Sequence, residues 1–261
     1  MILKMNKIVF TLMAMLISTQ AFAWGQIGHR VTGLIAEQYL TPQAQAAIDA
    51  ILPNEDLAEA STYADEMRSH PSEYWKKTAN PWHYVNVHKG EKYTEISIPE
   101  EGNAVTALEM FSKQLTSKKS SLKEKQLALR FIVHIIGDLH QPFHTGTHLD
   151  KGATDVKLSF FWDKSNLHRV WDSGLIDRQK LSYTEWTHRL KRKISTQQAK
   201  EWMEINPEIW IDESVELRLT LYPKHDEISW DYQYQSLPII KQRLQMGGIR
   251  IAAYLNALFS N

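Results

Sequence analysis

The sequence contains no cysteine, so no disulfide can stabilise the fold and no thiolate can hold a metal ion. Its 30 basic and 30 acidic residues balance, which argues against tight binding to duplex DNA by charge alone. Internal repeats and linkers rich in glycine, proline and serine are also absent. These absences favour one compact domain, and the eleven histidines suggest that metal ions replace disulfides as the stabilising element.

Long apolar runs are absent except near the start, where residues 8–17 follow Lys4 and Lys7. A run of about ten residues is too short to span a bilayer about 30 Å thick. Small residues at positions 21 and 23 form a cleavage site typical of a secretory leader. We therefore predict a signal peptide over residues 1–23, cleaved after Ala23, and a secreted or periplasmic domain over residues 24–261 that does not insert into a membrane. An uncleaved membrane anchor is the alternative.

Helical patterns dominate the remaining chain. Thr41 and Pro42 are typical of the N-cap and first turn of an amphipathic helix. Helix-type spacing of apolar residues recurs in five further segments, residues 103–115, 121–140, 195–205, 207–222 and 237–259. Gly247 and Gly248 would let another element approach the last of these closely. Residues 155–163 alternate and predict a strand of a small hairpin. Three tryptophans in helical segments are expected in the core: Trp186, Trp202 and Trp210.

The stretch HIIGDLHQPFH, residues 134–144, places polar side chains in an otherwise apolar helix. Burying such groups without partners is costly, so a ligand such as a metal ion is expected. At about 100° per residue, His134 and Asp138 lie one turn apart on the same face. His140 lies nearly opposite and is expected to be structural. Pro142 disfavours further helix and lets His144 turn back toward the pair.

A second pair with the same spacing lies in NLHRVWD, where Asn166 could cap a short helix that carries His168 and Asp172. Taken alone, this pair reads as an ordinary surface contact. Further candidates occur in WGQIGH, YADEMR and PWHYVNV. The complete set of ligand-type residues is His29, Asp65, His83, His134, Asp138, His144, His168 and Asp172. This set is larger than one tetrahedral zinc ion can use, so the predicted site is multinuclear.

The order of these motifs resembles the S1/P1 nuclease family of zinc-dependent, single-strand-preferring nucleases and 3′-nucleotidases. The resemblance covers nearly all of residues 24–261 through WGQIGHR, ADEMR, WHYVN, GNAVTAL, FIVHIIGDLHQPFH, NLHRVWD and GGIRIAAYLN. It implies a mainly α-helical, single-domain fold with a small β-hairpin, of the phospholipase C/P1 nuclease type.

The resemblance also implies three zinc ions per chain. The first would be held by Asp65, His83, His134 and Asp138, and the second by His144, His168 and Asp172. The third would be held by His29, by Asp138 as a bridge, and by the α-amino nitrogen and carbonyl oxygen of Trp24. This amine becomes free only when residue 23 is removed, so cleavage of the leader would complete the site.

The implied reaction is attack on phosphorus by a hydroxide that bridges two zinc ions, while the third stabilises the leaving 3′ oxygen. Single-stranded RNA and DNA would yield 5′-phosphorylated products, and 3′-nucleotides would also be substrates. Asp65 and Asp138 would serve catalysis as metal ligands. Arg68 would neutralise charge on the phosphate, the alternative being a plain ion pair with Asp65.

Residues after His83 are implied to bind the base. Tyr84 would stack on an unpaired base, and Asn86 would contact the base edge. The family has an acidic residue at the position of Asn86, so the base preference is open. The loop of residues 150–155 also departs from the family pattern, because Ala153 and Thr154 replace glycine and asparagine.

Two other functions compete with the nuclease. A zinc-dependent phospholipase C acting on phospholipid head groups would use the same chemistry, whereas a zinc-sequestering or adhesive protein would bind metal without turnover. No stable protein partner is implied, and a monomer is expected. The basic run at residues 189–193 is expected to be a solvated helix face, with contact to nucleic acid as the alternative.

Overall fold

The computed structural model of the chain describes residues 24–260, so the predicted signal peptide lies outside the described residues. The helices are α1 (Gln26–Ala36), α2 (Pro42–Ile51), α3 (Leu57–Ala60), α4 (Tyr63–Glu66), α5 (Ala104–Thr116), α6 (Leu122–Asp138), α7 (Leu167–Arg169), α8 (Leu175–Asp177), α9 (Tyr183–Lys191), α10 (Thr196–Trp202), α11 (Pro207–Arg218) and α12 (Trp230–Phe259). The strands are β1 (Lys157–Phe160), β2 (Asp163–Asn166) and β3 (Glu227–Ile228). The prediction of a mainly α-helical fold is confirmed. None of the helices within residues 24–260 combines the length and apolar character needed to cross a bilayer.

Side-chain caps begin several helices where the sequence predicts them. Thr41 accepts a hydrogen bond from the backbone of Ala44 at the start of α2, and Ser195 caps α10 in the same way. Asn166 caps α7 by accepting from the backbone N–H of Arg169. The predicted helix over residues 121–140 ends at Asp138, two residues early, as expected for a chain that must turn before Pro142.

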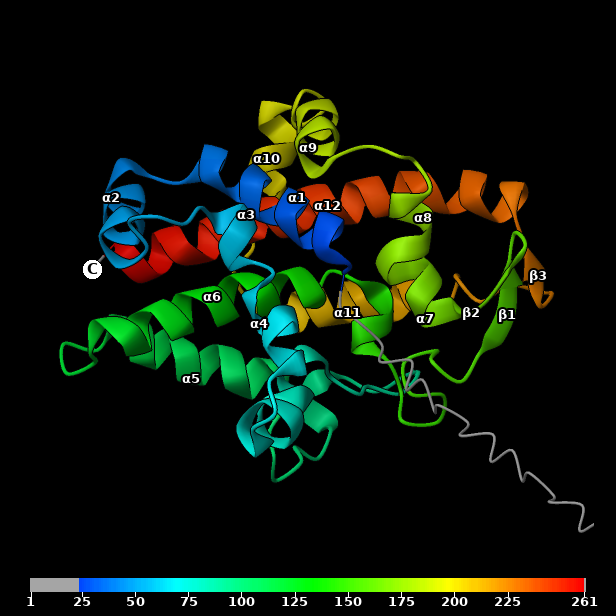
Figure 1. Cartoon of the computed structure of the whole chain (residues 1–261), viewed down its shortest axis with the longest axis horizontal. Coiled ribbons are helices and arrows are strands. Elements are labelled where there is room, and N and C mark those ends of the chain that lie inside the picture. Colours follow the sequence, from blue (N-terminus) through cyan, green and yellow to red (C-terminus); the bar gives the residue numbers. More distant parts are fainter. Residues whose placement is uncertain (1–23, 261) are drawn as a thin grey trace, which may run out of the picture.

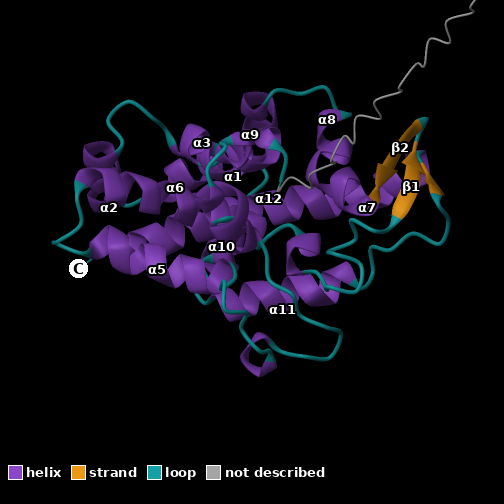
Figure 2. Cartoon of the chain, turned by 60° about the horizontal axis from the view of Figure 1, so that its bottom comes forward, coloured by secondary structure: helices purple, strands orange, loops and turns teal. Residues whose placement is uncertain are grey.

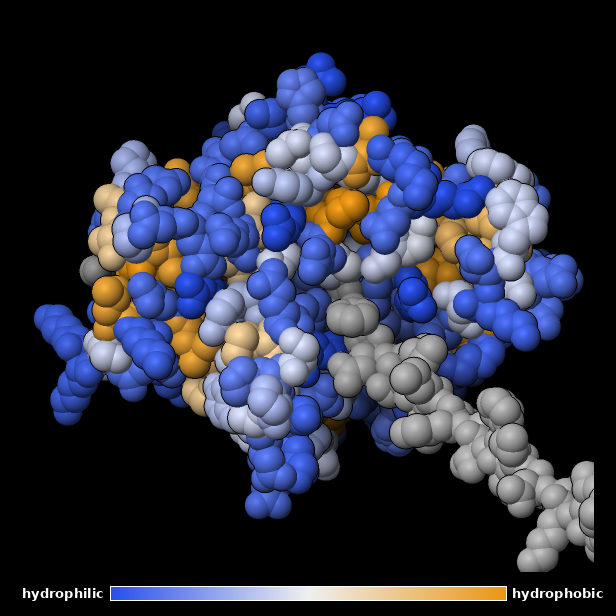
Figure 3. All heavy atoms as spheres, in the orientation of Figure 1, coloured by the Kyte–Doolittle hydropathy of each residue, from blue (hydrophilic) through white to orange (hydrophobic). Residues whose placement is uncertain are grey.

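Figure 1 shows α12 running along the length of the molecule, with α1 beside it and the α5–α6 pair below. A side-chain carbon built on Gly248 would lie 2.6 Å from Cβ of Ile35, so the close approach predicted for this glycine is confirmed. Figure 2 shows the small sheet at one end of the helical body. The viewed face in Figure 3 is mostly hydrophilic, with smaller hydrophobic patches among the hydrophilic areas.

The sheet differs from the predicted hairpin strand over residues 155–163. The chain turns at Phe161, whose φ of 57° ends β1 before the predicted strand is complete. β2 then pairs antiparallel with β1, and β3 adds to the other edge of β1 in parallel, which gives the order β2-β1-β3. The third strand comes from more than sixty residues away along the sequence, so its pairing could not be read from local alternation.

The last helix begins at Trp230 rather than near Leu237, with Pro238 inside it. A proline inside a helix removes a backbone hydrogen bond. The extra turns are held by tertiary contacts, because Tyr232 accepts a hydrogen bond from the Trp171 indole at 2.8 Å and donates to the carbonyl of Leu221 at 2.6 Å. These contacts explain why the helix continues on both sides of the proline.

Two apolar clusters form the core. One packs α5 against α6, where the rings of Phe111 and Phe131 stack at 4.4 Å. The other surrounds Trp24, Trp171 and Trp186. Trp210 is also buried, as predicted, whereas Trp202 is only half-buried, because α10 is short and lies on the outside of α12. Polar side chains of α1 and α6 meet between the two clusters.

Candidate active site

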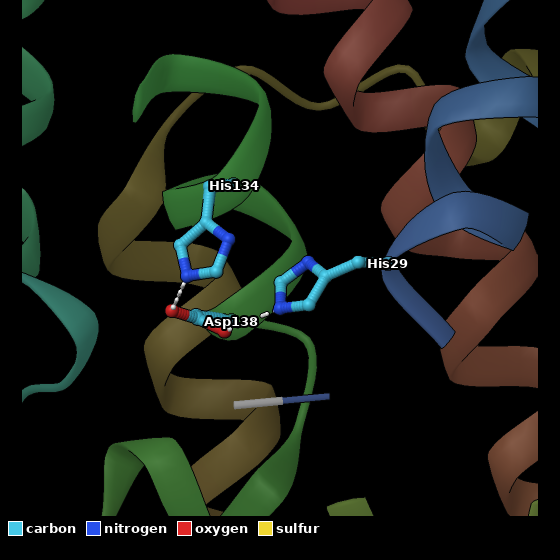
Figure 4. Close-up of side chains that lie close together, drawn as sticks. All are labelled: His29, His134 and Asp138. Atoms are coloured by element: carbon cyan, nitrogen blue, oxygen red, sulfur yellow. Dashed lines mark ion pairs between the residues drawn. The ribbon is translucent and has the colours of Figure 1, made fainter. Parts of the chain in front are cut away.

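Three buried side chains from two helices converge at the contact between α1 and α6 (Figure 4). The carboxylate of Asp138 lies between two imidazoles: Oδ1 is 3.2 Å from Nε2 of His29, and Oδ2 is 3.0 Å from Nε2 of His134. The exposed fraction of all three side chains is 0%. Because His134 and Asp138 are four residues apart in α6, the helix itself places them on one face, as the sequence predicts.

A second group adjoins the first through shared residues. Asp65 comes from α4, and His83 ends a 3₁₀ turn over Asn80–His83. Nδ1 of His83 lies 2.8 Å from Nε2 of His134 and 3.2 Å from Oδ2 of Asp138. Oδ1 of Asp65 lies 3.8 Å from the same His83 nitrogen and 3.9 Å from Nε2 of His134. Asp138 therefore faces both groups.

The third group brings together His144, His168 and Asp172. His144 lies in a 3₁₀ turn over Pro142–Thr145, His168 in α7, and Asp172 in the π turn Val170–Gly174. Nε2 of His168 is 3.1 Å from Oδ2 of Asp172, and Nε2 of His144 is 3.7 Å from its Oδ1. Nδ1 of His144 is 3.7 Å from Oδ1 of Asp138, so the three groups are contiguous. In each group, the candidate ligand atoms lie within 4.8 Å of one another.

Backbone carbonyls set the orientation of three of the imidazoles. Nδ1 of His134 donates to the carbonyl of Ser61 at 2.7 Å, and Nδ1 of His168 donates to that of Gly152 at 2.6 Å. Nδ1 of His144 likewise donates to the carbonyl of His83 at 2.6 Å. A neutral imidazole that donates through Nδ1 presents the lone pair of Nε2, so these rings aim Nε2 at the centre of the site.

Many polar atoms in these groups have no hydrogen-bond partner. The buried atoms of the candidate ligands without one are Nδ1 and Nε2 of His29, Oδ1 of Asp65, Oδ1 of Asp138, Nε2 of His144, Nε2 of His168 and Oδ2 of Asp172. Leaving buried polar atoms unsatisfied costs about 1–3 kcal/mol each. Imidazole nitrogens and carboxylate oxygens are the donors that zinc prefers apart from thiolate, so this set fits zinc ions.

The carboxylates control the charge of the site in the metal-free protein. Burial lowers the pKa of His144, but the charges of Asp138 and Asp172 outweigh burial and raise this pKa to about 9. Burial lowers the pKa of His83 to about 4, so its imidazole is neutral at pH 7. Burial alone would raise the pKa of Asp138, but the surrounding imidazoles, His134 first, hold it well below the usual range.

The predicted first residue of the processed chain lies beside these groups. Trp24 is fully buried, and the backbone N–H of Gly25 donates to the carbonyl of Asp172 at 2.8 Å. A side-chain carbon at Gly25 would lie 2.2 Å from Oγ of Ser173 and 3.2 Å from the carbonyl oxygen of Asp172, so a larger residue would have to displace the Ser173 side chain. The start of α1 is therefore fixed against the segment that carries Asp172.

A cavity of about 340 Å³ opens beside the site, and Arg68, Tyr84, Asn86 and Lys151 line it together with His83, His144 and His168. A larger cavity of about 680 Å³ adjoins it and shares Asn80, Tyr84, Asn86 and His148. We call the two together the Tyr84 cavity. Tyr84 is 38% exposed and lines both cavities, so it can contact a ligand there.

The chain is similar to known nucleases over nearly all of its described residues. The sequence profile described as S1/P1 Nuclease matches residues 24–260. The chain belongs to the S1/P1 nuclease family. It is 30% identical to Endonuclease 2 of Arabidopsis thaliana over 90% of each chain. It is 25% identical to Nuclease P1 of Penicillium citrinum, over 90% of this chain and 97% of that protein, and 22% identical to Nuclease S1 of Aspergillus oryzae, over 92% and 93%.

Arg68 of this S1/P1 nuclease family member lies between the candidate ligands and the Tyr84 cavity. Its Nη1 is 3.5 Å from Oδ1 of Asp65, so the ion pair considered from the sequence is present. The side chain also lines the Tyr84 cavity, where a phosphate could contact it. The ion pair and the predicted contact with phosphate are therefore compatible.

The loop of residues 150–155 includes a residue with a side chain in the left-handed conformation. Ala153 has a φ of 65°, which is a left-handed conformation that disfavours residues with a side chain. The loop nevertheless supplies the Gly152 carbonyl that orients His168. Thr154 lines the Tyr84 cavity.

Sequence reasoning missed Gln141. Its amide Nε2 donates to Oδ1 of Asp172 at 2.5 Å, and its Oε1 accepts from the backbone N–H of Phe143 at 2.6 Å. The Gln141 side chain is fully buried. It bonds only one carboxylate oxygen of Asp172, and the other, Oδ2, faces Nε2 of His168. The position of Gln141 within HQPFH, between two histidines, was the one available signal.

Proposed function

We propose that the mature protein is an exported, zinc-dependent phosphodiesterase that cleaves single-stranded RNA and DNA to 5′-phosphorylated products and also hydrolyses 3′-nucleotides. The observation that carries the proposal is the convergence of buried imidazole and carboxylate atoms that lack hydrogen-bond partners. Membership of the S1/P1 nuclease family supports a nuclease in general. The polymer, the products and the metal are the proposed refinements.

We assign the ligands to three zinc ions. Asp65, His83, His134 and Asp138 would hold the first, and His144, His168 and Asp172 the second. His29, Asp138 and the amine and carbonyl of Trp24 would hold the third. Bound zinc supplies positive charge at the phosphate and makes water acidic enough to attack phosphorus near neutral pH.

The protein's own side chains bind and orient the substrate. The Arg68 guanidinium would donate to the phosphate and offset the charge that develops there. The Tyr84 ring would stack on an unpaired base, which a duplex does not offer, and this explains the preference for single strands. The Asn86 amide can donate and accept, so it would contact the base edge without the restriction that a carboxylate imposes.

The same assignment links export to activity. An α-amine exists at Trp24 only after residues 1–23 are removed, so the precursor would lack one complete metal group. We expect protein that carries one extra residue before Trp24 to bind less zinc and to turn over slowly. Equal zinc content and equal rates in the two forms would rule out the amine as a ligand.

One assay panel tests the function. Mature protein is incubated with single-stranded RNA, single-stranded DNA, 3′-AMP and phosphatidylcholine vesicles, each with and without a chelator. The expected result is chelator-sensitive release of 5′-phosphorylated nucleotides and of phosphate from 3′-AMP. Hydrolysis of the lipid alone would instead identify a phospholipase C, and metal binding without any turnover would identify a sequestering protein.

A further inference from the structure

The candidate metal site borders a second cavity that the proposed function does not yet use. This cavity of about 690 Å³ is lined by two candidate ligands, Asp65 and Asp172, and by Gln26, Ser69, Arg169 and Ser173. We call it the Arg169 cavity. Among residues 24–260, its lining shares no residue with the Tyr84 cavity, which reaches the site through His83, His144 and His168. The ligand groups therefore border two separate cavities.

The two cavities differ in what they can recognise. The Tyr84 cavity has an exposed aromatic ring and a side-chain amide, which suit a base. The described residues that line the Arg169 cavity include no aromatic side chain, so it offers no ring for stacking. Serine hydroxyls, a glutamine amide and a guanidinium can all donate hydrogen bonds, and such donors suit a sugar–phosphate backbone.

The charge of the Arg169 cavity depends on bound metal. Its lining carries the carboxylates of Asp65, Glu66, Asp172 and Asp177. Metal ions held by Asp65 and Asp172 would offset two of these charges. Arg169 supplies the positive charge among the described lining residues, and it is exposed to solvent.

The base of the Arg169 side chain is held in place. Its backbone N–H donates to Oδ1 of Asn166 at 2.9 Å, and the preceding residue, His168, is anchored through Nδ1 to the Gly152 carbonyl. The guanidinium therefore extends from a fixed turn next to a candidate ligand. Because Arg169 and the candidate ligand Asp172 line the same cavity, a phosphate bound in that cavity could contact the guanidinium.

We infer that the Arg169 cavity binds the sugar–phosphate backbone of the nucleotide downstream of the cleaved bond, with Arg169 contacting a phosphate of the continuing strand. This inference rests on the proposed function. A 3′-nucleotide carries its base on the side of the leaving 3′ oxygen, so the base in the Tyr84 cavity belongs to the upstream nucleotide. The continuing strand would then leave through the Arg169 cavity, and Arg169 would separate polymer cleavage from hydrolysis of single nucleotides.

Arg169→Gln tests the inference with two substrates. For a single-stranded oligodeoxynucleotide, we expect kcat/KM to fall roughly three- to ten-fold, with the loss mainly in KM. The salt dependence of log kcat/KM should become shallower by about 0.7, the value for one phosphate contact on a single strand. For 3′-AMP, which has no downstream nucleotide, the rate should not change, and this shows that the variant is folded and loaded with metal.

Two further variants complete the comparison. Arg169→Lys keeps the charge and should recover most of the rate on the oligonucleotide. Arg192→Gln removes another exposed arginine, at the C-cap of α9 and outside both cavities, and should change the rate on neither substrate. If Arg169→Gln lowered kcat/KM equally for 3′-AMP and for the oligonucleotide, or for neither, the proposed role of Arg169 would be wrong.

A substrate with one cleavable bond tests the assignment of the two sides. An abasic sugar immediately downstream of that bond should be tolerated, whereas one immediately upstream should slow cleavage strongly. The reverse pattern, or equal losses, would contradict the inference. Failure of the wild-type protein on every nucleic-acid substrate would instead contradict the proposed function itself, so the two failures are distinguishable.

Discussion

Two buried polar clusters flank the end of α6, and they differ in how completely their atoms are paired. One consists of the candidate metal ligands. The other, which we call the arginine cluster, consists of His140, Glu213, Arg243 and Arg250. Both contain buried histidine and charged groups. Asp138 belongs to the first cluster, and His140 of the second cluster follows it by two residues.

The polar side chains of the arginine cluster form hydrogen bonds with one another. The Glu213 carboxylate accepts from Nη1 of Arg243 at 3.0 Å and from Nη2 of Arg250 at 2.8 Å. Nε2 of His140 accepts from Nη1 of Arg250 at 3.1 Å, and its Nδ1 donates to the carbonyl of Ile136 at 2.7 Å. Burial and the neighbouring arginine charges hold the pKa of His140 well below its usual value, so the ring stays neutral.

The candidate metal ligands are not fully hydrogen-bonded in this way, because residues in all three groups have buried atoms without hydrogen-bond partners. A buried histidine therefore does not by itself indicate a metal site. The informative feature is a set of converging imidazole and carboxylate atoms that have no hydrogen-bond partner in the protein. His140, two residues after Asp138, has protein partners for both nitrogens and needs no ion.

Asp138→Asn should break the ligand cluster most severely. This carboxylate faces His29, His83 and His134, so its loss affects two of the proposed ions. We expect metal content to fall by more than one ion per chain, and activity on single-stranded DNA to fall by more than about 100-fold, the upper range for loss of an outer partner. Elemental analysis and initial rates measure both effects. A variant with most of its activity would refute the bridging role.

Gln141→Met should weaken the ligand cluster by a smaller factor. The change keeps the side-chain length but removes the amide that holds Oδ1 of Asp172. We expect zinc affinity in the group of His144, His168 and Asp172 to fall about 10- to 100-fold. Competition with a chromogenic chelator measures it, with the exposed Gln38→Met as the control. Unchanged affinity would show that Asp172 does not depend on Gln141 for its orientation.

Glu213→Gln should disrupt the arginine cluster without emptying the metal site. It leaves two buried guanidiniums without their counter-charge, and the cost is reduced because the Glu213 side chain is 33% exposed. We expect the free energy of unfolding to fall by about 2 kcal/mol, measured by urea denaturation at fixed zinc concentration. Glu216→Gln, exposed on the same helix, is the control. A loss of bound zinc from the folded variant would contradict the separation of the two clusters.

The pH dependence of zinc binding should also separate the clusters. With its pKa raised to about 9, His144 is protonated at pH 7 in the metal-free protein, so zinc must displace a proton. Affinity should therefore rise up to about ten-fold per pH unit toward pH 9. His83, with a pKa of about 4, contributes no proton above neutrality. Calorimetry at pH 7 in buffers with different heats of ionisation should detect at least one released proton, from His144 and from the proposed Trp24 amine ligand, and release of none would contradict this assignment.

The raised pKa of His144 makes the metal-free protein less stable at high pH, whereas it makes zinc binding stronger there. Because the pKa of His144 is higher in the folded state than its usual 6.5, its ion pairs stabilise the metal-free protein fully below pH 6.5. This contribution is lost as the pH rises through about 9. Chelated protein should therefore unfold more easily at pH 9 than at pH 6.5, while the zinc-loaded protein should not follow this trend.

The parts of the structure that sequence predicted well are those set by local chemistry. The caps at Thr41 and Ser195 and the pairing of His134 with Asp138 follow from interactions within one or two helical turns. The features that sequence predicted wrongly depend on remote contacts. The start of α12 depends on Tyr232 meeting Trp171, and the third strand depends on β3 reaching β1.

The sequence by itself determined which residues could bind metal, because spacing and residue type decide which donors are available and which share a helical face. It also determined that the fold is mainly helical. Only the tertiary structure decided that Nε2 of His140 accepts a hydrogen bond from Arg250, whereas Nε2 of His144 has no hydrogen-bond partner. It also decided that Gln141 donates a hydrogen bond to Asp172. These outcomes depend on partners more than thirty residues away, and local sequence contains no information about which of them will lie within hydrogen-bonding distance.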